Sequence, residues 1–358
     1  MKLKLRVPTW TVIIPILAWV IYWGKSIFPG IGYSVILAIA LAAVIMTAVH
    51  HAEIVAYRVG EPFGTLLLAI AITVIEVSMI VSLMLAGGQE TDTLARDTVF
   101  AAVMIILTGI IGLCLLMGGL RFSEQSFGRH AVNASLVCLT AICVLTLILP
   151  NYTTSVFGPV YSTSQLIFIA VVSLVLYGSF VAVQTVRHRD YFLSPDAKGE
   201  APIAPPTKIA ATISLILLLV CLGAVILIAK SLAPALEQGV AYVGAPKSLV
   251  GVLVALVILL PEGLAALRAA RKNRLQTSLN LALGSALASI GLTIPAVAIV
   301  SLSSGMSVTL GIDTKSMVLL ILSLFIVMLS FGTGRTTILQ GIVLLVIFSV
   351  YLFMTVIP

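Results

Sequence analysis

Two glutamates stand inside strongly apolar segments of this sequence. Glu76 lies in AIAITVIEVSMIV and Glu262 lies in ALVILLPEGLAAL, whereas the other acidic residues fall in polar connections or near segment ends. A charge at the centre of a bilayer costs roughly 2.5–3.5 kcal/mol on insertion scales, so a lipid-facing position is disfavoured. We predict that both carboxyl groups face the protein interior and bind a proton or a cation. The alternative is a protonated glutamate that only hydrogen-bonds a neighbouring helix.

Further oxygen atoms lie near these carboxyl groups. Pro261 precedes Glu262, and a proline inside a helix leaves the carbonyl four residues earlier, that of Val257, without its donor. Irregular backbone at membrane depth is tolerated where it lines a cavity, so we expect a helix broken at Pro261 beside a cation site. The alternative is a simple kink. Four hydroxyl residues are candidate secondary ligands as a set, although each alone is more typical of helix packing: Thr73, Thr108, Ser285 and Ser289.

The two carboxylates also suggest a mechanism. Two ionised carboxylates without counter-ions are very unfavourable in an apolar interior. Two protons, one divalent cation or two monovalent cations would neutralise them. If only the neutral, loaded states can reorient, the protein must exchange cations for protons. Ca²⁺ binds about 6–8 oxygens, so carbonyl groups, hydroxyl groups and water would have to complete its shell.

The composition indicates that most of the chain lies in a membrane. Of the 358 residues, 60% are hydrophobic and 9% are charged, and the mean hydropathy is +1.21. An average soluble domain is about 25% charged, so soluble globular proteins and disordered chains are excluded. A nucleic-acid-binding protein is excluded too, despite the net charge of +7. The four cysteines lie in apolar runs without paired spacing, so we expect them to pack, and we predict no cofactor.

The chain divides into eleven apolar stretches, each close to the length of about 20 residues that spans a bilayer. The first is predicted to be a retained helix rather than a signal peptide, because no small-residue cleavage site follows it. The sequence therefore predicts an all-α polytopic membrane protein. The stretches are 8–24, 31–49, 63–87, 99–119, 132–150, 165–186, 209–229, 246–267, 279–303, 316–331 and 336–357.

The basic residues predict the orientation. With the N-terminus inside, alternate connections place fifteen of the twenty Lys and Arg residues on the inner side and five on the outer side. This asymmetry is typical of cytoplasmic loops. We predict a cytoplasmic N-terminus and an outside C-terminus in a bacterial inner membrane, which the absence of long additional domains favours.

The proline-containing connection 188–208 separates the last ten stretches into two groups of five. Because five is odd, two similar groups must cross the membrane in opposite directions, as in the inverted repeats of secondary transporters. Glu76 and Glu262 occupy the second helix of each group. The predicted parts are a leading helix at 1–30, a first repeat at 31–187, a linker at 188–208 and a second repeat at 209–358, with broken helices at the midplane.

Several segments together resemble the cation/proton exchanger family of the calcium/cation antiporter superfamily, most closely its bacterial ChaA branch. HAEIVAYRVGEPFGTLLLAIAITVIEV is similar to the first family signature, and MGGLRFSEQSF and YGSFVAVQTVRHRDYF to the stretches after it. In the second half, ILLPEGLAAL, LALGSALASIGLTIP and FGTGRTTILQG resemble family segments. The resemblance extends from about residue 45 to the end. In the first signature, the matching letters are Glu53, Arg58, Gly60, Glu61, Gly64 and Glu76.

The resemblance implies a leading helix, a ten-helix core of two inverted repeats, and cation-for-proton exchange by alternating access. It also implies that Glu76 and Glu262 form the shared site, with Ca²⁺, Na⁺ or K⁺ and H⁺ as transported substrates. Positions that carry asparagine or glutamine in the family hold Leu68, Thr73 and Ala288 here. Fewer side-chain oxygens therefore surround the site, and a Na⁺(K⁺)/H⁺ antiporter with little Ca²⁺ activity is the alternative.

A second polar group is expected at the inner end of the helix that contains His50 and His51. His51, Glu53 and Glu61 are candidates for a route by which protons or cations enter from the cytoplasm, because histidine titrates near neutral pH. The alternative is a solvated interfacial cluster.

Two other classes of function fit the sequence less well. A passive cation channel would need a continuous polar path, whereas the apolar stretches contain two isolated carboxylates. An intramembrane metalloprotease would need H-E-x-x-H, which is absent, and a serine protease would need a histidine inside the membrane. The sequence therefore predicts a secondary transporter and not an enzyme.

Overall fold

The computed structural model describes residues 8–24, 30–60, 63–87, 92–192, 206–242 and 244–357. Among these residues, nine helices are long and apolar enough to cross a membrane, and two shorter apolar helices cover Thr9–Trp23 and Ile70–Leu85. The prediction of a helical membrane protein is confirmed. The count of eleven spans and the inverted repeats stay predictions.

The chain forms two compact units, and each combines one segment from the first half of the chain with one from the second half. Unit 1 contains Met1–Gly88 and Glu200–Val243, and unit 2 contains Gln89–Gly199 and Gly244–Pro358. These units cut across the predicted sequential halves. The predicted division into repeats concerns internal symmetry, and it stays a prediction. Most of the predicted linker, residues 193–205, lies outside the described part of the chain.

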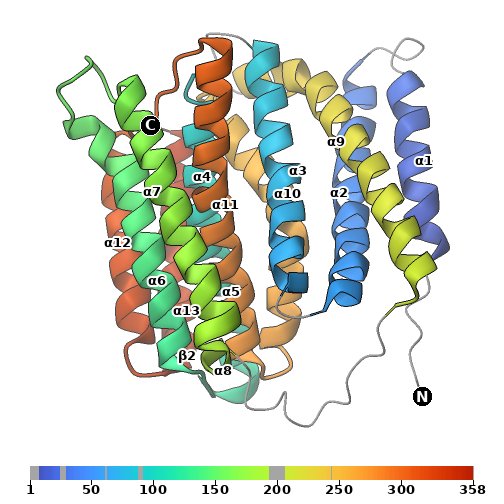
Figure 1. Ribbon diagram of the computed structural model, residues 1–358. Coiled ribbons are helices and arrows are strands. Elements are labelled where there is room, and N and C mark those ends of the chain that lie inside the picture. The colour runs from blue at the N-terminus through green and yellow to red at the C-terminus, as the bar shows by residue number, and fades with distance from the viewer. Residues whose placement is uncertain are drawn as a thin grey trace. The chain divides into compact units, whose positions relative to one another are not determined.

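Unit 1 is a group of long apolar helices in which α2 contacts the other three (Figure 1). Trp19 donates its indole N–H to the carbonyl of Val220 over 3.3 Å. A Cβ at Gly223 would lie 3.2 Å from the same indole ring, so glycine leaves the space that Trp19 fills. Its helices are α1 (Thr9–Trp23), α2 (Ile31–Val59), α3 (Phe63–Gly87) and α9 (Lys208–Tyr242).

Unit 2 is a larger helical bundle in which α4 packs on α10, α5 on α13, and α7 on α11. The first half of the chain supplies α4 (Leu94–Met104), η3 (Ile105–Ile110), α5 (Ile111–Phe122), α6 (Arg129–Cys143), η4 (Val144–Ile148), η5 (Leu149–Tyr152), α7 (Thr163–Ala182), η6 (Val183–Arg187) and α8 (Arg189–Phe192). The second half supplies α10 (Ser248–Ala270), α11 (Leu275–Ser304), α12 (Thr314–Phe331) and α13 (Ile338–Val356).

Glycines let two of these helices approach closely. A Cβ at Gly341 of α13 would lie 2.5 Å from the backbone nitrogen of Leu116 in α5. A Cβ at Gly112 would lie 3.0 Å from Leu345, on the other side of the same contact. Small residues at such crossings are typical of membrane helices, where close van der Waals packing replaces the hydrophobic drive.

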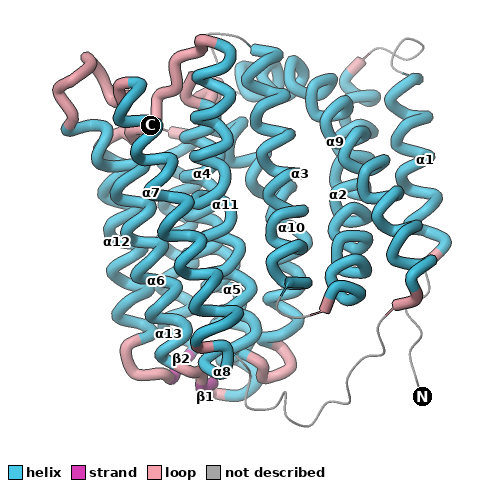
Figure 2. The backbone as a smooth tube through the Cα atoms, in the orientation of Figure 1, coloured by secondary structure: helices cyan, strands magenta, loops and turns pink. Residues whose placement is uncertain are grey.

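One end of unit 2 is closed by two short strands, β1 (Glu124–Ser126) and β2 (Arg335–Thr337), drawn in magenta in Figure 2. They pair antiparallel, with Gln125 opposite Thr336. The buried Gln125 amide also donates to the carbonyl of Ala270 over 3.1 Å and to Asn273 over 2.9 Å. These bonds place the end of α10 beside the strands, and we call this the strand end of unit 2.

The prediction of a helix broken at Pro261 is wrong. α10 is helical from Ser248 to Ala270, and α3 likewise continues through Glu76. A proline removes one backbone bond, but neighbouring helices support the backbone of a membrane helix well enough for it to continue. The departures from α-helical geometry lie elsewhere, in π-helical turns at Ile105–Ile110, Val144–Ile148 and Val183–Arg187.

Candidate functional site

Glu262 is a buried carboxyl group in unit 2, with 9% of the residue exposed. Its helix, α10, contacts α4, η3, α5 and α11. A Cβ at the adjacent Gly263 would lie 3.2 Å from the Cδ1 atom of Ile110, the last residue of the π-helical turn η3. The absence of a side chain at Gly263 thus lets the side chain of Ile110 pack directly against the backbone beside Glu262.

Thr108 lies inside this π-helical turn and is fully buried. Its hydroxyl donates to the carbonyl of Met104 over 2.5 Å. Because the proton is used in this bond, the lone pairs of the hydroxyl oxygen remain available as acceptors. π-helical turns inside α-helices occur frequently at functional sites. Thr108 was predicted from the sequence as a ligand, but the π-helical turn that holds it was not.

The predicted hydroxyl ligands of the second half lie on α11. Ser289 is buried and Ser285 is half-buried, one helical turn earlier. α11 contacts both α10 and η3, so unit 2 packs together the three elements that carry Glu262, Thr108 and the two serines. Val257, whose carbonyl was predicted as a backbone ligand, is half-buried on α10.

Glu76 is the corresponding buried carboxyl group of unit 1, with 3% of the residue exposed. Thr73 is buried three residues earlier, which places both side chains on one face of α3. α3 contacts α2 and α9 within the unit. Since Glu76 belongs to unit 1 and Glu262 to unit 2, a shared site of the two carboxylates stays a prediction.

The predicted cytoplasmic route falls partly in the contact between α1 and α2. His51 is fully buried, and its Nε2 atom lies 3.1 Å from the carbonyl oxygen of Thr11. His50 Nδ1 lies 3.9 Å from a carboxylate oxygen of Glu53, whose side chain is 44% exposed. Glu61 lies outside the described residues. The histidines therefore belong to helix packing in unit 1, and their role in ion entrance stays a prediction.

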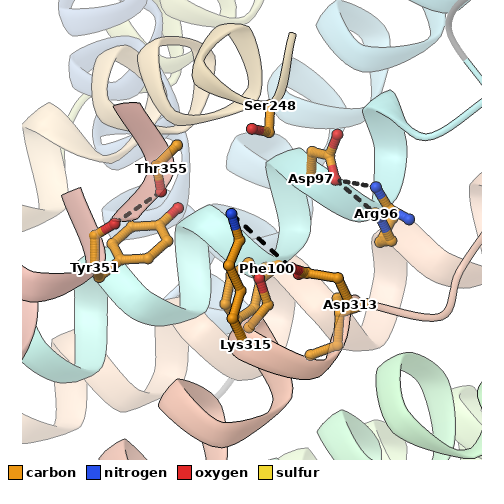
Figure 3. Close-up of a pocket in the computed structure, with 10 residues that line it drawn as sticks. Arg96, Asp97, Phe100, Ser248, Asp313, Lys315, Tyr351 and Thr355 are labelled. Carbon is orange, nitrogen blue, oxygen red and sulfur yellow. Dashed lines mark hydrogen bonds and ion pairs between the residues drawn. The ribbon is translucent and has the colours of Figure 1, made fainter. Parts of the chain in front are cut away.

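Sequence reasoning missed a polar cavity of about 140 Å³ at the other end of unit 2 (Figure 3). It lies where α4, α10 and α12 begin and where α13 ends. Its most prominent feature is a half-buried ion pair of Arg96 and Asp97. The adjacent opposite charges at a helix start were the available signal, but the residues that complete the cavity lie more than 150 positions away. Among the described residues, no group of three or more His, Cys, Asp or Glu side chains is placed to hold a metal ion.

Comparison with known proteins identifies the family. The sequence model of the family "Sodium/calcium exchanger protein" matches residues 26–186 and 213–357. The chain is 48% identical to y4hA of Sinorhizobium fredii, over 99% of this chain and 97% of that protein. It is 35% identical to the sodium-potassium/proton antiporter ChaA of Escherichia coli, over 98% of this chain and 96% of ChaA.

A solved structure shows the same fold. The structure of native YfkE superposes with a TM-score of 0.76 at 19% identity, and the match covers 97% of this chain and 100% of YfkE. The chain therefore belongs to the sodium/calcium exchanger protein family, and the resemblance to cation/proton exchangers of the ChaA branch is confirmed.

Proposed function

We propose that this protein is a secondary active antiporter that exports Ca²⁺, and also Na⁺ or K⁺, in exchange for protons by alternating access. The observation that carries the proposal is the burial of one carboxyl group in an apolar helix of each unit, Glu76 in α3 and Glu262 in α10. In the proposed mechanism, the two carboxylates bind either protons or cations, and only these neutralised states change the side they face.

The secondary ligands follow from the packing of each unit. Thr108, Ser285 and Ser289 lie on elements that contact α10, and Thr73 shares a face of α3 with Glu76. We propose that these hydroxyl groups, the Val257 carbonyl and water supplement the carboxylates.

A Na⁺(K⁺)/H⁺ antiporter with little Ca²⁺ activity is the second candidate. The 35% identity with ChaA, named a sodium-potassium/proton antiporter, supports it. So does the small supply of side-chain oxygens, because Ca²⁺ sites generally use several carboxylates. Proton release from the detergent-solubilised protein on addition of each cation in turn would distinguish the candidates.

We further propose eleven membrane spans, two inverted five-helix repeats and a cytoplasmic N-terminus in the bacterial inner membrane. Unit 2 supports the orientation by itself. Most of its basic residues lie at or near the strand end, whereas the opposite end has few. The first set includes Arg121, Arg129, Arg268, Arg271 and Arg335, and the second includes Arg96, Lys247 and Lys315. By the positive-inside asymmetry, the strand end faces the cytoplasm and the Arg96 end faces outward.

The exchange is tested with purified protein in proteoliposomes under an imposed pH gradient. We expect uptake of ⁴⁵Ca²⁺ or Na⁺ that depends on the gradient, and we expect Glu76→Gln and Glu262→Gln each to abolish it. Glu124→Gln is the matched control, because Glu124 is exposed on β1 and pairs only at the surface, with Arg335 over 3.3 Å. Full exchange by either site variant would remove that residue from the mechanism. Rapid flux independent of pH would favour a passive channel.

A further inference from the structure

The cavity at the outward end of unit 2 brings charged and hydroxyl groups from four helices together (Figure 3). Its volume of about 140 Å³ is well above the roughly 30 Å³ that one water occupies in the liquid. Side chains of α4, α10, α12 and α13 line it, and the hydroxyl groups at its wall are those of Ser248, Ser316, Tyr351 and Thr355. The cavity is thus large enough for a partly hydrated ion, and it offers charged and hydroxyl groups at its wall.

The Asp97 carboxylate already holds a monovalent cation, the guanidinium group of Arg96. The Nε and Nη2 atoms of Arg96 each lie 2.8 Å from Oδ1 of Asp97, and the hydroxyl of Thr93 donates to Oδ2 over 3.1 Å. The third guanidinium nitrogen donates to the carbonyl of Gly311 over 3.0 Å. The side chains of Arg96 and Asp97 are only 19% and 12% exposed. Buried charges of this kind require a partner, which each supplies to the other.

The other charges at the cavity balance one another in the same way. Lys315 lies 4.0 Å from Asp313, and its ammonium group also donates to the carbonyl of Met354 over 3.1 Å. This second pair is more exposed than the first, since 37% of the Lys315 side chain and 54% of the Asp313 side chain are accessible. Asp97 is therefore the more enclosed of the two carboxylates at this cavity.

The backbone at Asp97 is in direct contact with the helix that carries Glu262. A Cβ at Gly251 of α10 would lie 2.9 Å from both the carbonyl carbon of Asp97 and the nitrogen of Thr98. Gly251 and Glu262 are separated by eleven residues, about 16 Å along the helix axis. A ligand at Asp97 thus lies at the outer part of the same helix pair that leads toward Glu262.

We propose that this cavity is an outer access site for monovalent cations, with the Asp97 carboxylate as its binding group and Arg96 as a tethered counter-ion that occupies it when no ion is bound. A monovalent cation that displaces the guanidinium group adds one positive charge to this enclosed space, because Arg96 stays charged, whereas a divalent cation would add two. The name "outer" and the link to transport rest on the proposed function, but binding of the ion to Asp97 does not.

The test follows the accessibility of the cavity directly. In a Ser248→Cys variant, the new thiol lies at the cavity wall, and a membrane-impermeant methanethiosulfonate reagent is applied to vesicles of defined orientation. The parent protein gives the background, since Cys114, Cys143 and Cys221 are buried and Cys138 is half-buried. We expect modification only from the outer face, slowed at least threefold by saturating Na⁺ or K⁺ but not by N-methylglucamine at equal ionic strength.

Four further variants, one of them a control, identify the binding group. Asp97→Asn should remove the protection by Na⁺ and K⁺. Arg96→Gln should lower the half-protecting concentration severalfold, because the competing cation is gone, and Arg96→Lys should restore it toward the parent value. Asp313→Asn is the matched control and should leave protection in place. Absence of protection in Ser248→Cys itself, or equal protection in Asp97→Asn, would overturn the proposal.

The same preparation separates this inference from the proposed function. Glu262→Gln in the Ser248→Cys background should abolish exchange and leave protection by Na⁺ or K⁺ intact. Protection without any exchange in the Ser248→Cys protein, with Glu262 in place, would contradict the proposed antiport and retain the outer site. Exchange by the Ser248→Cys protein without protection would contradict the outer site alone.

Discussion

Replacing Gly263 by alanine tests whether the contact between η3 and α10, next to Glu262, affects the rate of exchange. Glycine inside a helix is less stable than alanine by roughly 0.5–1 kcal/mol, so the substitution alone favours the helix. At this position, however, the new Cβ would lie 3.2 Å from Cδ1 and 3.4 Å from Cγ1 of Ile110, which must move by a few tenths of an ångström. The cost of moving the end of the Ile110 side chain slightly off its rotamer, ~0.5–1 kcal/mol, should cancel the gain, so we expect little change in the free energy of unfolding.

We expect the strain to change the rate of exchange instead. If the strain destabilises only one of the two alternating states, ~0.5–1 kcal/mol shifts the equilibrium between these states about two- to fivefold. The exchange rate at a limiting cation concentration should fall by a similar factor. Gly284→Ala in α11 is the control, because its Cβ would meet no atom within 4 Å. It should raise the melting temperature slightly in detergent and leave exchange unchanged.

A double variant tests the contact itself. Ile110→Val removes the Cδ1 atom that the new methyl group meets, so Gly263→Ala with Ile110→Val should recover most of the exchange rate. The assays are thermal unfolding in detergent and pH-driven exchange in proteoliposomes with equal protein content. If Gly263→Ala matches Gly284→Ala in both stability and exchange, the contact between η3 and α10 has no part in the transport cycle.

Two other substitutions give expected outcomes from the packing of unit 2. Gly341→Ala should destabilise the protein by about 1–3 kcal/mol, because the new Cβ would meet the backbone nitrogen of Leu116, which a change of rotamer cannot move away. Thermal unfolding in detergent measures this loss. Gly178→Ala is the control and should leave the stability unchanged, because its Cβ would meet no atom within 4 Å. Thr108→Val should weaken cation-induced proton release severalfold, because it removes the hydroxyl oxygen. Thr108→Ser keeps this oxygen and should retain most of the release. Equal release by both variants would exclude this hydroxyl as a ligand.

The apolar stretches predicted the positions of the helices well but not their full lengths. The stretch 209–229 became α9, which continues through Lys230 and Pro234 to Tyr242, and the stretch 31–49 became α2, which ends at Val59. Hydropathy reports the part of a helix that suits lipid, and the polar turns beyond it remain helical at the membrane surface, where their side chains reach water. Helix ends are therefore less predictable from apolar runs than helix cores.

The burial of the two glutamates followed from the sequence, whereas the π-helical turns and the outer cavity did not. Insertion energy depends mainly on residue type and depth, so Glu76 and Glu262 could be assigned to the interior from composition alone. The π-helical turn around Thr108 depends on which carbonyl each N–H meets in the packed bundle, and no residue type specifies that choice. The bond from Arg96 to Gly311 joins residues 215 positions apart, so only the folded chain reveals it.

α10 connects the features of unit 2 that the proposed function uses. It contacts α4 at Gly251, against the backbone of Asp97 and Thr98, and it contacts η3 at Gly263, the residue after Glu262. Because α4 and η3 are consecutive parts of one helical segment, α10 touches the same span at two levels. A displacement of α10 by itself would have to separate both contacts, one of them between backbones. We therefore expect the backbone contact at Gly251 to persist during exchange, so that a change between the two transport states falls on the side-chain contact between Gly263 and Ile110.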